Sequence, residues 1–191
     1  MNLPNKLTLL RVILIPVFLV FVYVPAIPLH FLWALVIFAA ASLTDMLDGK
    51  IARARGLVTN FGKFLDPLAD KVLVITALTV LVELEEFRMS AIPLVIIIAR
   101  EFMVSGLRLL AAEEGVVIAA GIWGKLKTAF TMVTIVAAFG YLTVAADFGV
   151  TVPEFVRVWI LGLLILISTV LTIISGLVYL KGCWKYIDSD K

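Results

Sequence analysis

Four aspartates are the residues of this sequence whose type and spacing could do chemistry. Asp45 and Asp48 are three positions apart, and Asp66 and Asp70, a short distance downstream, are four apart. Residues at these spacings lie on one face of an α-helix, so each pair would present two carboxylates in the same direction. Four carboxylates close together repel one another and do not all stay ionised without a compensating charge. A divalent cation supplies that charge.

The ligand types favour a hard cation. Carboxylate oxygens without histidine or cysteine suit Mg²⁺ or Mn²⁺ better than Zn²⁺, and four carboxylates are enough for two ions that share bridging oxygens. Mg²⁺ in proteins commonly binds a few carboxylates together with phosphate oxygens, so we expect a substrate that carries phosphate. The expected metal ligands are Asp45, Asp48, Asp66 and Asp70.

Two small residues and an arginine follow the first aspartate pair. Gly49 and Ala52 share the helix face of Asp45, and Arg53 comes directly after them. Their lack of bulk would let a nucleotide or pyrophosphate approach the helix closely, while Arg53 adds positive charge. A plainer alternative is that the aspartates form interfacial salt bridges with neighbouring lysines and arginines, or cap helix starts.

The elements that must position these residues are membrane helices. Of the 191 residues, 63% are hydrophobic and 16% are charged, and the mean hydropathy is +1.14. Soluble domains have about 45–50% apolar and about 25% charged residues, so this composition excludes an ordinary soluble protein. Apolar stretches long enough to span a bilayer cover residues 7–24, 29–47, 67–84, 91–112, 126–146 and 155–180. We predict an all-α integral membrane protein of six transmembrane helices, forming a bundle in a single domain, residues 1–191.

The aspartates fall where the second and third of these helices meet. The second helix must continue past its apolar run to carry Asp48, Gly49 and Ala52 on the face of Asp45. Pro67 suits the first turn of the third helix, where its missing N–H costs nothing. The connection between the two helices is short, so we expect them to be antiparallel neighbours.

Basic residues distinguish the two sides of the predicted bundle. Of the 16 lysines and arginines, only Arg88 and Arg157 fall on one side, and the rest lie on the other side or within spans. Basic residues concentrate in cytoplasmic loops, so we place both termini and the aspartates in the cytoplasm. The net charge of +2 is too small to indicate a nucleic-acid partner.

The fourth predicted span carries charges that need an explanation. Arg100, Glu101 and Arg108 lie within it, where an ionised side chain costs several kcal/mol unless it is paired, snorkels or faces water. Glu101 and Arg108 are seven positions apart and share a helix face, so we expect an ion pair between them. Arg100 either faces a polar cavity or serves as a packing partner.

The aspartate pattern resembles the signature of the CDP-alcohol phosphotransferases. That signature is Asp-x2-Asp-Gly-x2-Ala-Arg-x8-Gly-x3-Asp-x3-Asp, and its fixed residues here are Asp45, Asp48, Gly49, Ala52, Arg53, Gly62, Asp66 and Asp70. Further segments, 2–16, 62–71, 100–108 and 124–128, resemble the bacterial members that use glycerol 3-phosphate. The resemblance covers most of the chain.

The resemblance implies a fold and a reaction. Family members are six-helix membrane bundles, usually homodimers, with the metal site in a cytoplasm-facing polar cavity, and they displace CMP from a CDP-linked donor by means of an alcohol. Here it implies that CDP-diacylglycerol and sn-glycerol 3-phosphate give phosphatidylglycerophosphate and CMP. The enzyme would be a multi-pass protein of the bacterial cytoplasmic membrane, surrounded by membrane lipids, with two Mg²⁺ or Mn²⁺ ions as cofactors.

The resemblance also implies residue roles. Asp45, Asp48 and Asp66 would hold the metal ions, and Asp70 would be a further ligand and the general base that activates the acceptor hydroxyl. The CDP moiety would bind Gly49, Ala52, Arg53 and Gly62. The acceptor's phosphate needs cations, for which bidentate arginine contacts are the expected solution. Our candidates, in order, are Arg108, Lys125, Arg100 and Lys127, with Thr8 and Arg11 on the first span.

Two alternatives stay open. A relative within the family could use phosphatidylglycerol, serine or an inositol phosphate as acceptor. A divalent-cation transporter is the rival from another class, because intramembrane aspartates also line ion pathways. A pathway needs polar residues through the membrane depth, whereas these carboxylates cluster at one interface, and this favours the enzyme.

Overall fold

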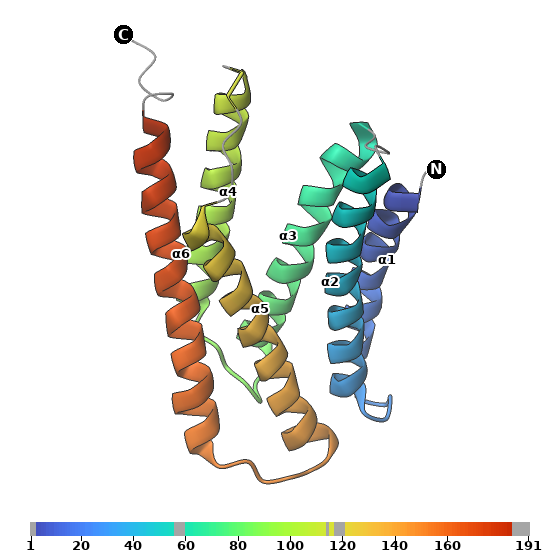
Figure 1. Cartoon of the computed structure of the whole chain (residues 1–191). Coiled ribbons are helices and arrows are strands. Elements are labelled where there is room, and N and C mark those ends of the chain that lie inside the picture. The colour runs from blue at the N-terminus through green and yellow to red at the C-terminus, as the bar shows by residue number, and fades with distance from the viewer. Residues whose placement is uncertain (1–2, 56–59, 114, 117–120, 185–191) are drawn as a thin grey trace. The chain divides into compact units, whose positions relative to one another are not determined.

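The described part of the chain is almost entirely helical. The computed structural model describes the backbone of residues 3–55, 60–113, 115–116 and 121–184, and within these ranges the side chains other than those of 3–4, 45–55, 60–64, 66 and 113. In this part the chain forms six α-helices and two short π-helical segments, with no strand (Figure 1). They are α1 (Leu3–Tyr23), α2 (His30–Arg55), α3 (Asn60–Glu83), α4 (Ala91–Glu113), α5 (Ile122–Leu142), η1 (Thr143–Asp147), η2 (Val156–Leu161) and α6 (Gly162–Cys183). The predicted all-α class is confirmed.

The helices follow the apolar stretches closely, with one correction. The second helix runs on to Arg55 as expected, so the segment after its apolar run is helical. The third begins at Asn60, and Pro67 therefore lies inside α3 and not in its first turn. Asn60 is a residue type that favours helix starts, and the helix extends about two turns before the apolar run begins. Since Pro67 has no N–H, the carbonyl four residues earlier lacks its usual helical partner.

One compact unit comprises Met1–Arg88 and Ile135–Pro153. In it α1 packs against both α2 and α3, and α2 also contacts α3 and η1 (Figure 1). The rings of Phe18, Phe38 and Phe139 are fully buried, and the Phe18 centroid lies 6.3 Å from that of Phe38 and 5.3 Å from that of Phe139. Such tilted and edge-on aromatic pairs stabilise packing beyond the area they bury. This cluster joins α1 and α2 to the last residues of α5.

The start of α2 is capped by a residue from a distant part of the same unit. The N–H of Leu32 donates to Asp147 Oδ2 at 2.7 Å, and the N–H of Phe31 donates to Oδ1 at 3.4 Å. The first N–H groups of a helix have no partner within it and carry positive partial charge, so a carboxylate stabilises them. The helix that carries Asp45 and Asp48 is therefore anchored at its opposite end.

The second unit comprises Met89–Thr134 and Glu154–Lys191. In it α4 packs against α6, around a buried cluster of Val104, Leu107, Tyr179 and Cys183. Hydroxyl groups join the first half of α5 to α6: Thr131 Oγ1 lies 2.8 Å from Ser168 Oγ, and Thr134 Oγ1 donates to the Leu164 carbonyl at 3.3 Å. Interhelical hydrogen bonds of this kind hold helices together in lipid, where burial of apolar surface gives little driving force.

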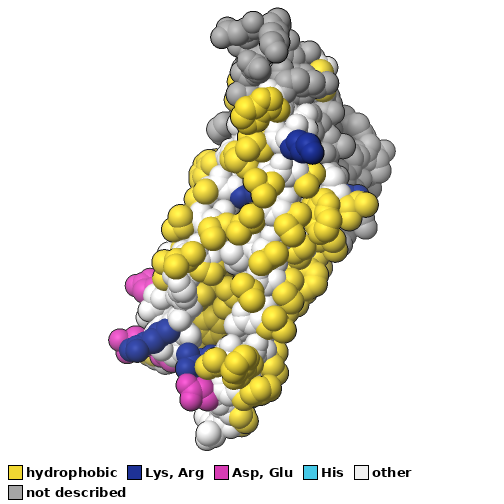
Figure 2. Space-filling view, turned by 90° about the vertical axis from the view of Figure 1, so that its left-hand side faces the viewer, with side chains coloured by type: hydrophobic (Ala, Val, Ile, Leu, Met, Phe, Trp, Pro, Cys, Tyr) yellow, Lys and Arg dark blue, Asp and Glu magenta, His cyan; other side chains and the backbone are white. Residues whose placement is uncertain are grey.

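The surface is that of a membrane protein. Within the residues that the structure describes, three helical segments are long and apolar enough to cross a bilayer, Asn5–Tyr23, Ile122–Asp147 and Val156–Cys183, and His30–Thr44 is a shorter apolar helix. On the face shown in Figure 2, hydrophobic side chains are spread along the whole described length, and most charged side chains gather near the lower end. Trp159 and Trp184 are 67% and 58% exposed near opposite ends of η2 and α6. They are separated by roughly 37 Å of helix, as expected for tryptophans at the two interfaces of a bilayer.

Candidate active site

The aspartate segments lie on two helices of the same unit that contact each other. Asp45 and Asp48 belong to α2, and Asp66 and Asp70 belong to α3, so both pairs have the helical spacing that places them on one face. The end of α2 and the start of α3 lie at the same end of this unit (Figure 1). The side chain of Asp70 is partly buried.

The remaining predicted ligands and nucleotide contacts lie outside the described side chains. They are Asp45, Asp48, Gly49, Ala52, Arg53, Gly62 and Asp66. Among the side chains that are described, no group of three or more His, Cys, Asp and Glu residues could hold a metal ion. The donor set itself consists only of carboxylates at helical spacing, which fits a hard divalent ion. The metal site stays a prediction.

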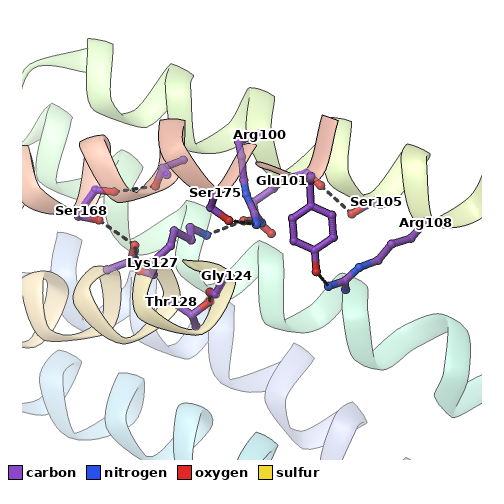
Figure 3. A network of polar contacts seen from close by, with 12 residues as sticks. Arg100, Glu101, Ser105, Arg108, Gly124, Lys127, Thr128, Ser168 and Ser175 are labelled. Atoms are coloured by element: carbon purple, nitrogen blue, oxygen red, sulfur yellow. Dashed lines mark hydrogen bonds and ion pairs between the residues drawn. The ribbon is translucent and has the colours of Figure 1, made fainter. Parts of the chain in front are cut away.

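A second polar cluster lies in the other unit, inside otherwise apolar helices. We call Arg100, Arg108, Lys127 and Glu101 the cationic cluster. Arg100 Nη1 donates to Glu101 Oε1 at 3.0 Å, and Lys127 Nζ donates to the same oxygen at 2.5 Å (Figure 3). The side chains of Arg100, Lys127 and Glu101 are only 11%, 6% and 17% exposed. Charges so deeply buried persist only when they are paired and hydrogen-bonded.

The third cation of this cluster has a different partner. Arg108 Nη2 donates to the Tyr179 hydroxyl oxygen at 2.7 Å, and its guanidinium carbon lies 5.3 Å from the centroid of the Tyr179 ring. The expected Glu101–Arg108 ion pair is therefore wrong. The carboxylate of Glu101 pairs with Arg100 and Lys127, whereas Arg108 contacts the ring and the hydroxyl of Tyr179 on α6.

Arg100 is held between three helices. Its Nη2 donates to Ser175 Oγ of α6 at 2.6 Å, and its guanidinium carbon lies 5.5 Å from the Tyr179 ring centroid. Two glycines leave room for it. A Cβ at Gly176 would lie 3.3 Å from Arg100 Cγ, and one at Gly124 would lie 3.7 Å from Arg100 Nη2. Arg100 thus serves as a packing partner within the unit, with its charge paired to Glu101. That it also faces a polar cavity stays a prediction.

Comparison with known proteins identifies the family. The sequence profile of the CDP-alcohol phosphatidyltransferase family matches residues 1–177. The chain belongs to this family. Because of this membership, the chain is an enzyme of phospholipid synthesis. CDP-alcohol phosphatidyltransferases generally use a divalent metal ion.

Relatives within the CDP-alcohol phosphatidyltransferase family match over nearly their whole length. The chain is 40% identical to a protein of Bacillus subtilis (strain 168) over 99% of this chain and 98% of the relative. It is 39% identical to one of Rickettsia bellii, over 97% of each chain, and 38% identical to one of Pseudomonas fluorescens, over 100% of this chain and 94% of the relative. Each of these relatives is named CDP-diacylglycerol–glycerol-3-phosphate 3-phosphatidyltransferase.

The remaining candidates for acceptor binding in this CDP-alcohol phosphatidyltransferase are placed differently from one another. Lys125 is exposed, and its backbone N–H donates to the Gly121 carbonyl at 3.3 Å, whereas its side chain has no hydrogen bond or ion pair with a described residue. Thr8 and Arg11 belong to α1, in the first unit, and are fully buried. The Nε of Arg11 donates to the Ala41 carbonyl at 3.3 Å.

Sequence reasoning missed Ser175 and Tyr179. Both lie on α6, four positions apart and therefore on one helix face. Two polar side chains on one face of a strongly apolar helix are a signal that could have found them, because polar groups inside a span mark partners or sites.

Proposed function

We propose that this CDP-alcohol phosphatidyltransferase is a phosphatidylglycerophosphate synthase. It transfers the phosphatidyl group of CDP-diacylglycerol to sn-glycerol 3-phosphate and releases CMP. The names and full-length similarity of the relatives support the substrates. We further propose one domain, residues 1–191, that crosses the bacterial cytoplasmic membrane six times as a homodimer, with both termini and the active site on the cytoplasmic side.

The charge of the cationic cluster is the observation that carries this proposal. Arg100, Arg108 and Lys127 bring three positive charges, and Glu101 is the one carboxylate that pairs with them among the described residues. The surplus of two positive charges matches a phosphate monoester, which carries nearly two negative charges at pH 7. A zwitterionic serine or the single charge of a phosphodiester does not require it. An inositol phosphate has the same charge, and the names of the relatives favour glycerol 3-phosphate over it.

The aspartates of α2 and α3 would hold two Mg²⁺ or Mn²⁺ ions. Asp45, Asp48 and Asp66 are the proposed ligands, with Asp70 as a fourth. When bound, such ions neutralise the pyrophosphate of the donor and the charge that develops on the departing CMP. Gly49, Ala52, Arg53 and Gly62 would accept the CDP moiety.

Asp70 has the proposed role of general base. The primary hydroxyl of glycerol 3-phosphate attacks the phosphorus that carries the diacylglycerol, and the bond from this phosphorus to the bridging oxygen breaks, so that CMP leaves. The hydroxyl proton passes to the Asp70 carboxylate. A carboxylate is a weak base, so the orientation of the acceptor contributes much of the effect. Arg108, Arg100 and Lys127, with Lys125, Thr8 and Arg11 as further candidates, would orient the acceptor through its phosphate.

A panel of acceptors tests the proposal. Purified protein in detergent is given CDP-diacylglycerol and Mg²⁺ or Mn²⁺, together with glycerol 3-phosphate, phosphatidylglycerol, serine or an inositol phosphate, and CMP release is measured. We expect release with glycerol 3-phosphate alone. Faster release with another acceptor would assign a different reaction within the family. No release with any acceptor, together with Mg²⁺ flux into liposomes, would favour the transporter.

A further inference from the structure

The ring of Tyr179 lies beside both arginines of the cationic cluster. We infer that Tyr179 is a positioning residue that holds the guanidinium of Arg108 in place for the acceptor's phosphate, and so sets the preference for a phosphorylated acceptor. This inference rests on the proposed function. It assigns a role to a residue of α6 that the aspartate signature does not contain.

The tyrosine is itself immobilised by its surroundings. It is only 7% exposed and packs in the buried cluster with Val104, Leu107 and Cys183. Buried side chains in such clusters are close-packed and have little freedom to move. A guanidinium that is hydrogen-bonded to the hydroxyl and lies against the ring is therefore held to a fixed part of the unit.

Arg108 depends on this contact more than Arg100 does. Arg108 is an exposed residue, and its guanidinium contacts in the described part of the chain are the 2.7 Å hydrogen bond to Tyr179 and the 5.3 Å contact with the ring. Arg100 has Glu101 at 3.0 Å and Ser175 at 2.6 Å as further partners. Removing the tyrosine would thus release Arg108 while Arg100 stays in place.

The hydrogen-bond inventory separates the roles of the two arginines. A guanidinium has five N–H donors in a rigid fork. Arg100 uses both of its Nη atoms on Glu101 and Ser175, whereas Arg108 uses one Nη on Tyr179. Among the described residues Arg108 therefore has partners for few of its donors, which leaves most of them for a phosphate, a group that arginine binds in a bidentate manner. Arg100 contributes mainly charge.

The test measures kinetic constants for the two substrates separately. Tyr179→Phe keeps the ring and removes the hydroxyl, so we expect the KM for glycerol 3-phosphate to rise about fivefold, the effect of one lost hydrogen bond. Tyr179→Leu removes the ring contact as well, and we expect a rise of about 20-fold or more. In both variants kcat stays within about twofold and the KM for CDP-diacylglycerol is unchanged. Inorganic phosphate is used as a competitive inhibitor against glycerol 3-phosphate, and we expect its inhibition constant to rise by the same factor as the KM.

A double-mutant cycle tests whether the tyrosine acts through Arg108. If it does, Tyr179→Phe added to Arg108→Gln raises the KM for glycerol 3-phosphate by less than about twofold, because the group it positions is already gone. The matched control is Tyr141→Phe in the first unit, whose ring packs against Phe87 with centroids 6.2 Å apart. We expect this control to leave all constants within about twofold.

Three results would overturn the inference. The first is an unchanged KM for glycerol 3-phosphate in Tyr179→Phe. The second is a fall in kcat together with a rise in the KM values of both substrates. The third is the full rise in the KM for glycerol 3-phosphate when Tyr179→Phe is added to Arg108→Gln. Tyr179→Phe carries the test if Tyr179→Leu does not fold. An inactive wild-type protein would refute the proposed function first, whereas an active wild type with an unaffected Tyr179→Phe refutes only the role of the tyrosine.

Discussion

Replacing Glu101 by glutamine removes the negative charge of the cationic cluster, the one carboxylate that pairs with its cations among the described residues. Its carboxylate lies 3.0 Å from Arg100 and 2.5 Å from Lys127, and at these distances each attraction is about 5 to 7 kcal/mol for an effective dielectric constant of about 20, before desolvation is subtracted. Breaking a buried ion pair destabilises proteins by about 3 to 5 kcal/mol. The glutamine oxygen still accepts one hydrogen bond, so we expect the lower value, about 3 kcal/mol.

Thermal unfolding of the purified protein in detergent measures this effect. One kcal/mol shifts the Tm of a chain of this size by about 2 to 4 °C, so Glu101→Gln is expected to lower the Tm by about 6 to 12 °C. The control is Glu154→Gln, which breaks a surface pair with Arg157 at 2.9 Å in which Glu154 is 77% exposed. Exposed pairs contribute about 0 to 1 kcal/mol, so its Tm should change little.

The variant also predicts a response to phosphate. Without Glu101 the surplus positive charge in the cluster rises from two to three, so added inorganic phosphate should raise the Tm of Glu101→Gln more than that of the wild type. Equal Tm values for Glu101→Gln and Glu154→Gln would refute the reasoning about the buried pair. An equal phosphate effect in variant and wild type would refute the assignment of the cluster to a phosphate.

Three further substitutions test other parts of the structure. Asp70→Asn should reduce CMP release by at least about 100-fold while calorimetry still shows metal-dependent binding of CDP-diacylglycerol. Loss of both CMP release and donor binding would make Asp70 chiefly a metal ligand, and unchanged CMP release would remove Asp70 from the mechanism. Asp147→Ala removes the cap of α2, which lowers the free energy of unfolding by about 1 to 2 kcal/mol and the Tm by about 2 to 8 °C. Asp147→Asn keeps one oxygen and should lower the Tm less, and an unchanged Tm in both variants would contradict the capping role. Gly176→Ala places a Cβ 3.3 Å from Arg100 Cγ and should raise the KM for glycerol 3-phosphate about two- to threefold, whereas Gly140→Ala, whose Cβ meets nothing within 4 Å, should leave this KM unchanged. Equal KM values for the two alanine variants would show that Gly176 is not needed to accommodate Arg100.

The sequence predicts the helices well because hydrophobicity is the dominant signal in a membrane protein. Each of the six apolar stretches corresponds to an α-helix or to an α-helix with its π-helical extension. The prediction for Pro67 was wrong because it took the apolar run as the extent of the helix. The helix instead begins at Asn60, in polar sequence where hydrophobicity gives no boundary.

Partners on other helices could not be predicted from spacing alone. The seven-residue interval between Glu101 and Arg108 fixes a shared face of α4, but it does not say which residue of another helix reaches that face. Lys127 of α5 and Tyr179 of α6 decide the pairing. The cap on α2 was missed for the same reason, because Asp147 is 115 residues after Leu32 and carries no local signal at the start of that helix.

The cap on α2 has a consequence for the order in which the chain assembles. The N–H of Leu32 bonds a carboxylate that is synthesised 115 residues later. At about 5 to 20 residues per second, a ribosome needs roughly 6 to 23 seconds to reach it. Throughout that interval the first turn of α2 must find its hydrogen bonds in water or lipid headgroups. The helix that bears the first aspartate pair therefore reaches its final form only after the fifth helix has been synthesised, and the enzyme completes its first unit late in translation.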